Sequence, residues 1–152
     1  AGAGAALALA CDIVIAADNA SFIQSFCRLG LVPDSGGSWF LPRLAGHARA
    51  MGMAMLGDKI SAQQALAWGM IWQVVPADEL TDRTQTLARH LATQPTYGLG
   101  LIKKALYSSA TNSLDQQLDL ERDLQRLGGR SDDYREGVSA FFAKRTPNFS
   151  GK

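Results

Sequence analysis

The sequence has few of the side chains that bind metals or form disulfides, with two cysteines and two histidines among 152 residues. Cys11 and Cys27 have neither the spacing of a zinc knuckle nor the density of a secreted disulfide scaffold. Two histidines do not complete a zinc site with them. These shortages predict no metal site, and they predict reduced, buried thiols in a cytoplasmic protein.

An excess of charge is also lacking, since 15 Lys and Arg residues face 14 Asp and Glu residues for a formal net charge of +1. The two signs are interspersed, so no basic face is predicted for nucleic acid or for an anionic membrane surface. No run of about twenty apolar residues suggests a membrane span. The apolar opening, residues 1–10, lacks the basic start of a signal peptide and is interpreted as structure. We expect a globular protein with no nucleic-acid or membrane partner.

Apolar periodicity and turn residues predict an α/β protein whose strands all lie in its first half. The strands are expected at residues 12–17, 21–24 and 70–75. A small-residue helix is expected after the glycines near the start, and further helices at residues 38–44, 47–56, 61–68, 78–93, 96–110, 113–127 and 132–145. Strands followed by helices alone indicate a core with a helical appendage. We place the boundary at Pro95, which gives a core of residues 1–94 and an appendage of residues 95–152.

Local signals support several of these helices. Ser61 and Ser113 each stand three residues before a glutamine, which is the spacing of a capping box. Met51 and Met55 share one side of the predicted helix 47–56 and are expected in the core. The histidines lie in helical patterns, and neither is given a role.

The chain is organised around residues 29–39, LGLVPDSGGSW. A turn-forming proline, two glycines and one ionisable residue separate an apolar run from a predicted helix, which is how a loop presents a side chain to a ligand. Asp34 is the candidate. The same pattern fits an ordinary turn in which Asp34 or Ser35 caps the next helix, the commoner role of Asp there. It is also similar to the nucleophile segment of chymotrypsin-like proteases, but both histidines follow Ser35 in helical patterns, which disfavours that interpretation.

Four stretches, in order and over essentially the whole chain, resemble the enoyl-CoA hydratase/isomerase, or crotonase, superfamily. They are AGAGAALALACDIVIA at residues 1–16, LGLVP with GG at 29–37, GDKISAQQA leading to GMI at 57–71, and REGVSAF with KR at 135–145. The resemblance implies the C-terminal part of a crotonase-like ββα spiral core over residues 1–94. It implies that a helical trimerisation region follows over residues 95–152.

The resemblance also implies a chemistry. The family polarises a thioester carbonyl with two backbone N–H groups, and one of these is expected at Ala3, at a helix N-terminus whose dipole favours negative charge. Hydratases of the family carry two glutamates, where this chain has Ala6 and Phe26. Isomerases carry one acid at the position of Asp34. A CoA-thioester isomerase is therefore implied, with Asp34 moving one proton and the Ala3 N–H stabilising the enolate.

Substrate and partner residues follow from the same resemblance. Phe26, Val32 and Trp39 are expected around the acyl group, and Asp34 is expected to be buried among apolar neighbours. CoA enters as part of the substrate, so no cofactor is implied, and the assembly is a homotrimer or a dimer of trimers.

The last helix contributes to the site by the same resemblance. Phe141 and Lys144 match positions that reach a neighbouring subunit's CoA, Lys144 toward a phosphate. For Phe141 and Phe142, packing in a core is an equally open interpretation.

Three shorter matches favour family members that convert a ring-epoxidised phenylacetyl thioester to an oxepin. They are PDSGG at residues 33–37, WGMIWQVV at 68–75 and LDLER at 118–122. The same apparatus would move a β,γ double bond into conjugation. An enoyl-CoA hydratase and a non-catalytic crotonase-like subunit are the alternatives.

Overall fold

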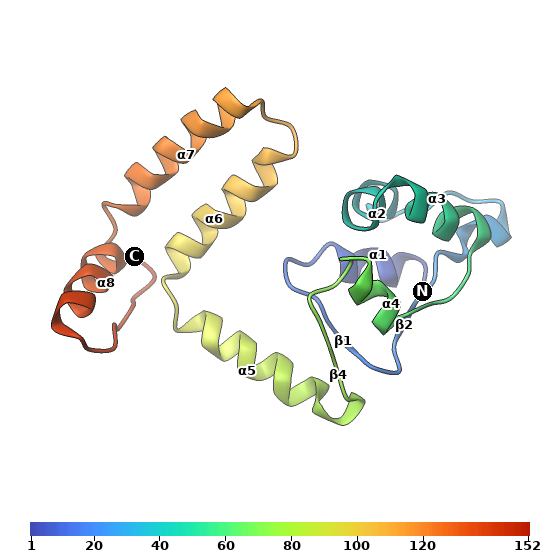
Figure 1. The fold of residues 1–152 in the computed structure, drawn as a ribbon, viewed down its shortest axis with the longest axis horizontal. Coiled ribbons are helices and arrows are strands. Elements are labelled where there is room, and N and C mark those ends of the chain that lie inside the picture. The colour runs from blue at the N-terminus through green and yellow to red at the C-terminus, as the bar shows by residue number, and fades with distance from the viewer. The chain divides into compact units, whose positions relative to one another are not determined.

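The structure, a computed structural model, describes all 152 residues and divides into two compact units, Ala1–Gln85 and Thr86–Lys152. The division falls inside helix α5 (Leu80–Ala92), whereas the sequence analysis placed the boundary after residue 94. Each unit is described by itself below (Figure 1). No helix combines the length and the apolar character needed to cross a bilayer.

The first unit contains short helices and very short strands. In chain order they are α1 (Ala3–Leu9), β1 (Ile15–Ala17), β2 (Ser21–Phe22), η1 (Ser25–Leu29, a 3₁₀ helix), α2 (Gly37–Ala45), α3 (His47–Leu56), β3 (Ile60–Ser61), α4 (Ala62–Ala67), β4 (Gln73–Val75) and η2 (Ala77–Glu79, also 3₁₀). Strand β1 pairs in parallel with β4, with Ile15 opposite Gln73. Strand β2 pairs antiparallel with β3, with Phe22 opposite Ile60.

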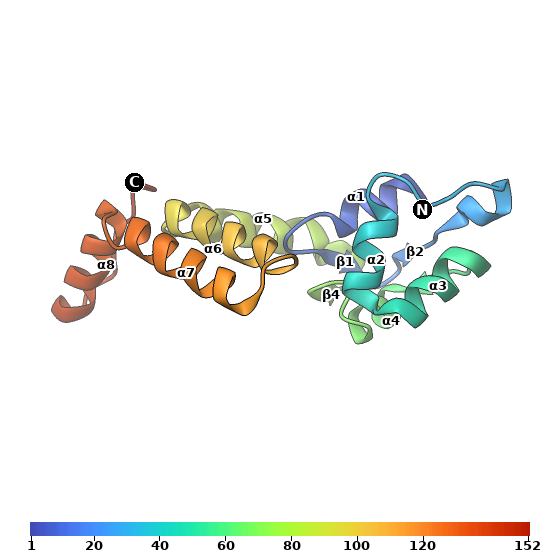
Figure 2. The ribbon, with the colours of Figure 1, turned by 90° about the horizontal axis from the view of Figure 1, so that it is seen from above.

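Small side chains let the helices of this unit approach closely. Alanines of α1, α2, α3 and α4 are buried together with Leu9, Leu41 and Met53. The ribbons of these four helices are shown in Figure 2. At the contact between α1 and α2, a Cβ added to Gly37 would lie 3.4 Å from the Cβ of Ala6. An added methyl group would therefore already be in van der Waals contact with Ala6, which shows how closely α2 approaches α1. The contact fixes the start of α2 against α1.

The predicted helices of this unit are confirmed, but the three strands expected at residues 12–17, 21–24 and 70–75 are shorter, at Ile15–Ala17, Ser21–Phe22 and Gln73–Val75. Residues 11–13 form a bend, so the strand expected from residue 12 begins only at Ile15. Helix α3 turns Ala50 and Met53 inward and leaves Met51 and Met55 exposed, so the core placement of those two methionines is wrong. Both cysteines are free, but Cys11 is exposed rather than buried.

The second unit is helical. It contains the end of α5, then α6 (Thr96–Ser109), α7 (Leu114–Gly128) and α8 (Asp132–Ala143). Helices α6 and α7 form an antiparallel hairpin (Figure 1), in which the Gln117 side-chain amide donates to the carbonyl of Ala105 at 3.1 Å. The predicted capping box at Ser113 is confirmed, because the Ser113 hydroxyl accepts from the Gln116 N–H and the Gln116 side chain accepts from the Ser113 N–H. At Ser61 only half of it forms, because its hydroxyl accepts from the Gln64 N–H while the Gln64 side chain makes no return bond.

The C-terminal segment folds back onto α8. The buried carboxylate of Asp133 accepts the backbone N–H groups of Ser150 and Gly151 at 2.6 and 2.9 Å. Both carboxylate oxygens of Glu136 accept from the Arg145 guanidinium, at 2.6 and 2.8 Å, and one also accepts from the Asn148 N–H. These hydrogen bonds, those from Arg145 above all, lower the pKa of Glu136 to about 2. Two carboxylates of α8 therefore hold the end of the chain.

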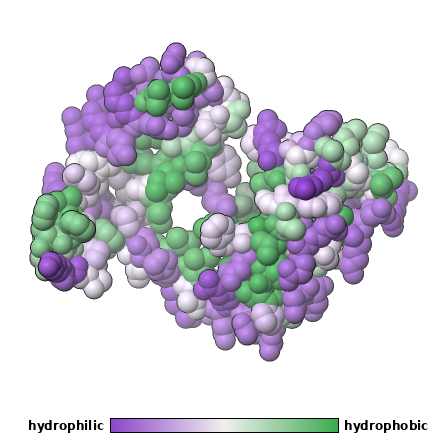
Figure 3. Space-filling view, viewed as in Figure 1, coloured by the Kyte–Doolittle hydropathy of each residue, from purple (hydrophilic) through white to green (hydrophobic).

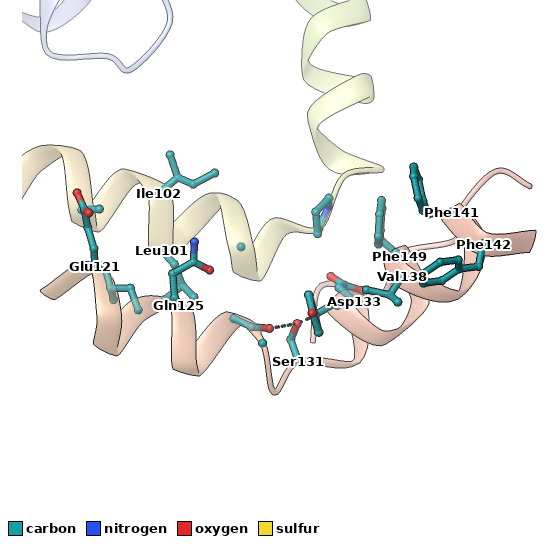
Figure 4. A pocket seen from close by; sticks show the side chains of 18 residues that line it. Leu101, Ile102, Glu121, Gln125, Ser131, Asp133, Val138, Phe141, Phe142 and Phe149 are labelled. Atoms are coloured by element: carbon teal, nitrogen blue, oxygen red, sulfur yellow. Dashed lines mark hydrogen bonds between the residues drawn. The ribbon is translucent and has the colours of Figure 1, made fainter. Parts of the chain in front are cut away.

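An apolar groove runs along this unit, and we call it the helical groove. Its volume is about 680 Å³, and its lining includes Leu101, Ile102, Leu124, Val138 and Phe149 (Figure 4). At the end of α8, Phe141 and Phe142 are both 79% exposed, with ring centroids 5.8 Å apart. Apolar atoms gather over α8 on the face seen in Figure 3. The second unit thus leaves a large apolar surface uncovered within this chain.

Candidate active site

The start of α1 presents a free backbone donor. Gly2, with a φ of 53°, precedes the helix, and its N–H donates to the carbonyl of Ile23 at 2.8 Å. The first helical N–H with a partner is that of Ala5, which donates to the Gly2 carbonyl. The N–H of Ala3 has none, as is usual in the first turn of a helix. Ala3 therefore lies where the sequence analysis expected an N–H able to meet an oxyanion.

Phe26 lies beside this helix start. Its ring atoms would be 3.6 and 3.8 Å from a Cβ added to Gly2, so the half-buried ring borders the residue before Ala3. The carbonyl of Phe26 accepts the N–H of Leu31 at 3.0 Å, which closes η1 and directs the chain into the next loop. One element therefore borders the Ala3 donor and leads to the segment that carries Asp34.

Asp34 lies in a tight turn just before α2. Its carbonyl accepts the N–H of Gly37 at 2.7 Å, and the next residues, Ser35 and Gly36, have φ values of 50° and 80°. Ser35 in the left-handed region is a strained residue, a feature that concentrates at functional sites. Its hydroxyl donates to Oδ1 of Asp34 at 3.1 Å. The N-cap of α2 is Gly36, with no side-chain capping bond, so the interpretation of Asp34 or Ser35 as a cap is wrong.

The expected burial of Asp34 is also wrong within this chain, because its carboxylate is exposed. Of the apolar residues expected nearby, Val32 is 79% exposed and Trp39 41% exposed, whereas Phe26 is half-buried. The Trp39 ring instead meets the Arg43 guanidinium, whose Cζ lies 3.9 Å from the ring centroid, and the edge of Phe40. Arg43, which the sequence analysis did not single out, thus holds one face of Trp39.

Gly37 lies at the contact between the turn that carries Asp34 and the helix that begins at Ala3. A Cβ added there would lie 3.4 Å from the Cβ atoms of both Ala6 and Pro33 and 3.8 Å from Oε1 of Gln24. The turn with Asp34 is therefore packed onto the helix that begins at Ala3. Gln24 is a further residue that the sequence analysis gave no role, although a polar residue ending the apolar run at residues 21–24 was the available signal.

The two predicted residues of α8 belong to the second unit. Phe141 is exposed, so the alternative that it packs in a core of this chain is wrong. Lys144 ends α8 with a φ of 52°, its side chain is exposed, and no hydrogen bond or ion pair of its ammonium group is formed. Both side chains are therefore accessible at the C-terminal end of α8. Nowhere do three or more His, Cys, Asp or Glu side chains gather as a metal site would need.

Comparison with known proteins decides the family. The family model described as enoyl-CoA hydratase/isomerase matches residues 1–152. The chain belongs to this family. The resemblance found in the four sequence stretches is thereby confirmed.

Curated relatives and a solved structure extend the comparison. The chain is 68% identical over 152 residues to a 1,2-epoxyphenylacetyl-CoA isomerase from Escherichia coli strain K12, covering all of this chain and 58% of that protein. It is 36% identical to a trans-2-decenoyl-[acyl-carrier-protein] isomerase from Streptococcus mutans, again over all of this chain and 58% of the relative. A crystal structure of an enoyl-CoA hydratase from Polaromonas sp. JS666 superposes with a TM-score of 0.93 at 39% identity, covering 98% of this chain and 58% of that one. The chain has the crotonase fold and spans about 58% of the length of these relatives.

Proposed function

We propose that the protein carrying this chain is a CoA-thioester isomerase in which Asp34 moves a proton. The observation that carries the proposal is the Asp34 turn: a carboxylate that caps no helix lies on a strained turn packed against the helix of the Ala3 donor. The 68% identity to an isomerase of an acyl-CoA supports the same reaction class.

The mechanism needs one base and two oxyanion donors, and this chain would supply the base and one of the donors. The Asp34 carboxylate removes a proton from the carbon next to the thioester carbonyl, and the electron pair moves onto the carbonyl oxygen as an enolate. The N–H of Ala3 donates to that oxygen, where the positive end of the helix also stabilises it. Asp34 then returns the proton to the γ carbon, and the double bond ends between the α and β carbons. Because Ser35 donates to Oδ1, the other oxygen, Oδ2, is left for the proton.

Hydration is less well supported by the same residues. The two positions where family hydratases carry glutamates hold Ala6, which is fully buried, and Phe26, whose ring borders Gly2. Neither side chain can bind or activate a water molecule. The site has a base for moving a proton and lacks the pair of acids for adding water.

For the substrate we propose a 1,2-epoxyphenylacetyl thioester of CoA, which is rearranged to the oxepin, on the strength of the 68% identical relative. Phe26, Val32 and Trp39 would contact its acyl group. Phe141 and Lys144 would contact the CoA of a neighbouring subunit, and CoA would enter only as part of the substrate.

For the assembly we propose a homotrimer, or a dimer of trimers, in the cytoplasm. The support for an assembly is the exposed pair Phe141 and Phe142 together with the helical groove, an apolar surface of the kind that subunit contacts bury.

The proposal is tested by turnover of a β,γ-enoyl-CoA by the full-length protein, followed by the absorbance of the conjugated product. We expect Asp34→Asn to lose at least about a hundredfold in kcat, as removal of a general base does. The matched control is Asp58→Asn, an exposed aspartate of the same unit. Equal turnover by Asp34→Asn and the unaltered protein would refute the role of Asp34, and turnover by none of the three proteins would favour a non-catalytic subunit.

A further inference from the structure

Gln24 is a buried polar side chain without a partner. Its exposed fraction is 0%, and neither Nε2 nor Oε1 of its carboxamide has a hydrogen-bond partner. A carboxamide offers two donors and an acceptor, and leaving them unpaired in an interior destabilises the folded state. An unpaired buried group of this kind calls for an explanation, and a role in function is one of the few available.

Gln24 lies where the turn with Asp34 packs against α1. Its Oε1 lies 3.8 Å from the position of a Cβ on Gly37, a position that Ala6 and Pro33 also approach. Ala6 and Pro33 offer no polar side-chain atom to the carboxamide. Beside Gly37, however, the backbone N–H of Ser38 has no partner either. An unpaired acceptor and an unpaired donor therefore lie at the same end of α2.

We propose that Gln24 is a positioning residue of the isomerase, one whose carboxamide pairs with the first turn of α2 when an acyl-CoA is bound. This inference rests on the proposed function. The first turn of α2 follows directly from Asp34, so the bond would fix the carboxylate relative to the Ala3 N–H on the neighbouring helix. Ser35, held at a φ of 50°, gives the turn a strained conformation of the kind that the surrounding structure must hold in place. Gln24 would act through Asp34 and would not touch the substrate.

For a substitution of Gln24, a positioning role and a purely structural role predict changes in Tm of opposite sign. Gln24→Met keeps the length of the side chain and removes its polar atoms. If the carboxamide is unpaired in the free protein, the substitution removes a penalty, and Tm should rise by about 2–4 °C. If it positions Asp34, kcat should fall about ten- to a hundredfold with KM changed less than about twofold. If the carboxamide is needed only for folding, Gln24→Met should instead lower Tm.

The experiment measures Tm, kcat and KM of the full-length protein with a β,γ-enoyl-CoA for three forms: unaltered, Gln24→Met and Gln63→Met. Gln63 is exposed on α4, so its substitution should change none of these values. Higher Tm with lower kcat in Gln24→Met supports the proposal. A lower Tm, or an unchanged kcat while the unaltered protein turns over, overturns it and leaves the proposed function intact. Absence of turnover in the unaltered protein overturns the proposed function, and this inference with it.

Discussion

Gly57 is the position where a single added methyl group should disturb the site's framework most directly. It ends α3 with a φ of 65°. A Cβ there would meet Sγ of Cys27 at 3.0 Å, Nε of Arg28 at 3.3 Å and the backbone carbonyl of Gln24 at 3.3 Å. These atoms belong to η1 and the residue before it, the segment that holds Phe26. Gly57→Ala should therefore push this segment away from α3.

The loss of stability expected for Gly57→Ala has two parts, the backbone conformation and the steric overlap. A substitution at a second glycine, Gly30, measures the first part alone. Gly30 has nearly the same backbone conformation, with a φ of 68°, but an added Cβ there would meet nothing within 4 Å. Gly30→Ala should cost only the left-handed conformation, about 1 kcal/mol. Gly57→Ala should add about 1–3 kcal/mol of overpacking, for a total of about 2–4 kcal/mol. Arg28, whose guanidinium donates to the Gly57 carbonyl at 3.0 Å, limits how far the segment can relax.

Urea unfolding of the full-length protein measures both substitutions. We expect the free energy of unfolding to fall clearly further for Gly57→Ala than for Gly30→Ala. Adding Cys27→Ala to Gly57→Ala removes the atom at 3.0 Å, so the double variant should lose less stability than the sum of the two single variants. Equal losses for the two glycine variants, or additive losses in the double variant, would refute the packing described between α3 and η1.

Two further predictions concern α8. The pKa of Glu136 is lowered from 4.5 to about 2 by its bonds to Arg145 and the Asn148 N–H, so its contribution to stability is complete above about pH 4.5 and is lost as pH falls toward 2. The difference in unfolding free energy between the unaltered protein and Glu136→Gln should therefore shrink over that range. Glu79→Gln, at an exposed carboxylate, serves as the control. A difference for Glu136→Gln that does not depend on pH would contradict the ion pair. Lys144→Ala should weaken acyl-CoA binding about three- to tenfold, since an exposed contact to a phosphate is worth roughly 1 kcal/mol, and calorimetry of a saturated acyl-CoA measures it. Unchanged affinity would remove Lys144 from the site.

Most of the helices could be predicted from the sequence, because the signals that start and end a helix lie within a few residues of its ends. The Ser113 box, Gly57 after α3 and Pro95 before α6 act within one turn of chain, and the structure places helix ends at each of them. Burial was predicted less well, since it depends on which side of an element meets another element. Helix α3 shows this, because its methionines share an apolar character but only Met53 faces the core.

The sequence predicted the principal residues of the candidate site, but it predicted neither their contacts nor a role for Gln24 or Arg43. The turn residues before α2 identified the Asp34 loop, and the pattern left open whether Asp34 caps the helix. Only the backbone of Ser35 and Gly36 settled that point, because their positive φ values turn the chain so that no side chain reaches the helix start. The unpaired state of Gln24 depends on atoms from three separate segments, so no sequence pattern indicates it.

The most direct test of the central claim follows the proton itself. The full-length protein, with Asp34 or with Asp34→Asn, is incubated with a β,γ-enoyl-CoA in deuterated water, and the deuterium in the conjugated product is measured by mass spectrometry. A single carboxylate that takes the α proton, exchanges it with solvent while the enolate is bound and then delivers it to the γ carbon predicts labelled product, and both the product and its label should disappear with Asp34→Asn. Labelled product formed equally fast by the asparagine variant would contradict the account and assign the proton transfer to another group.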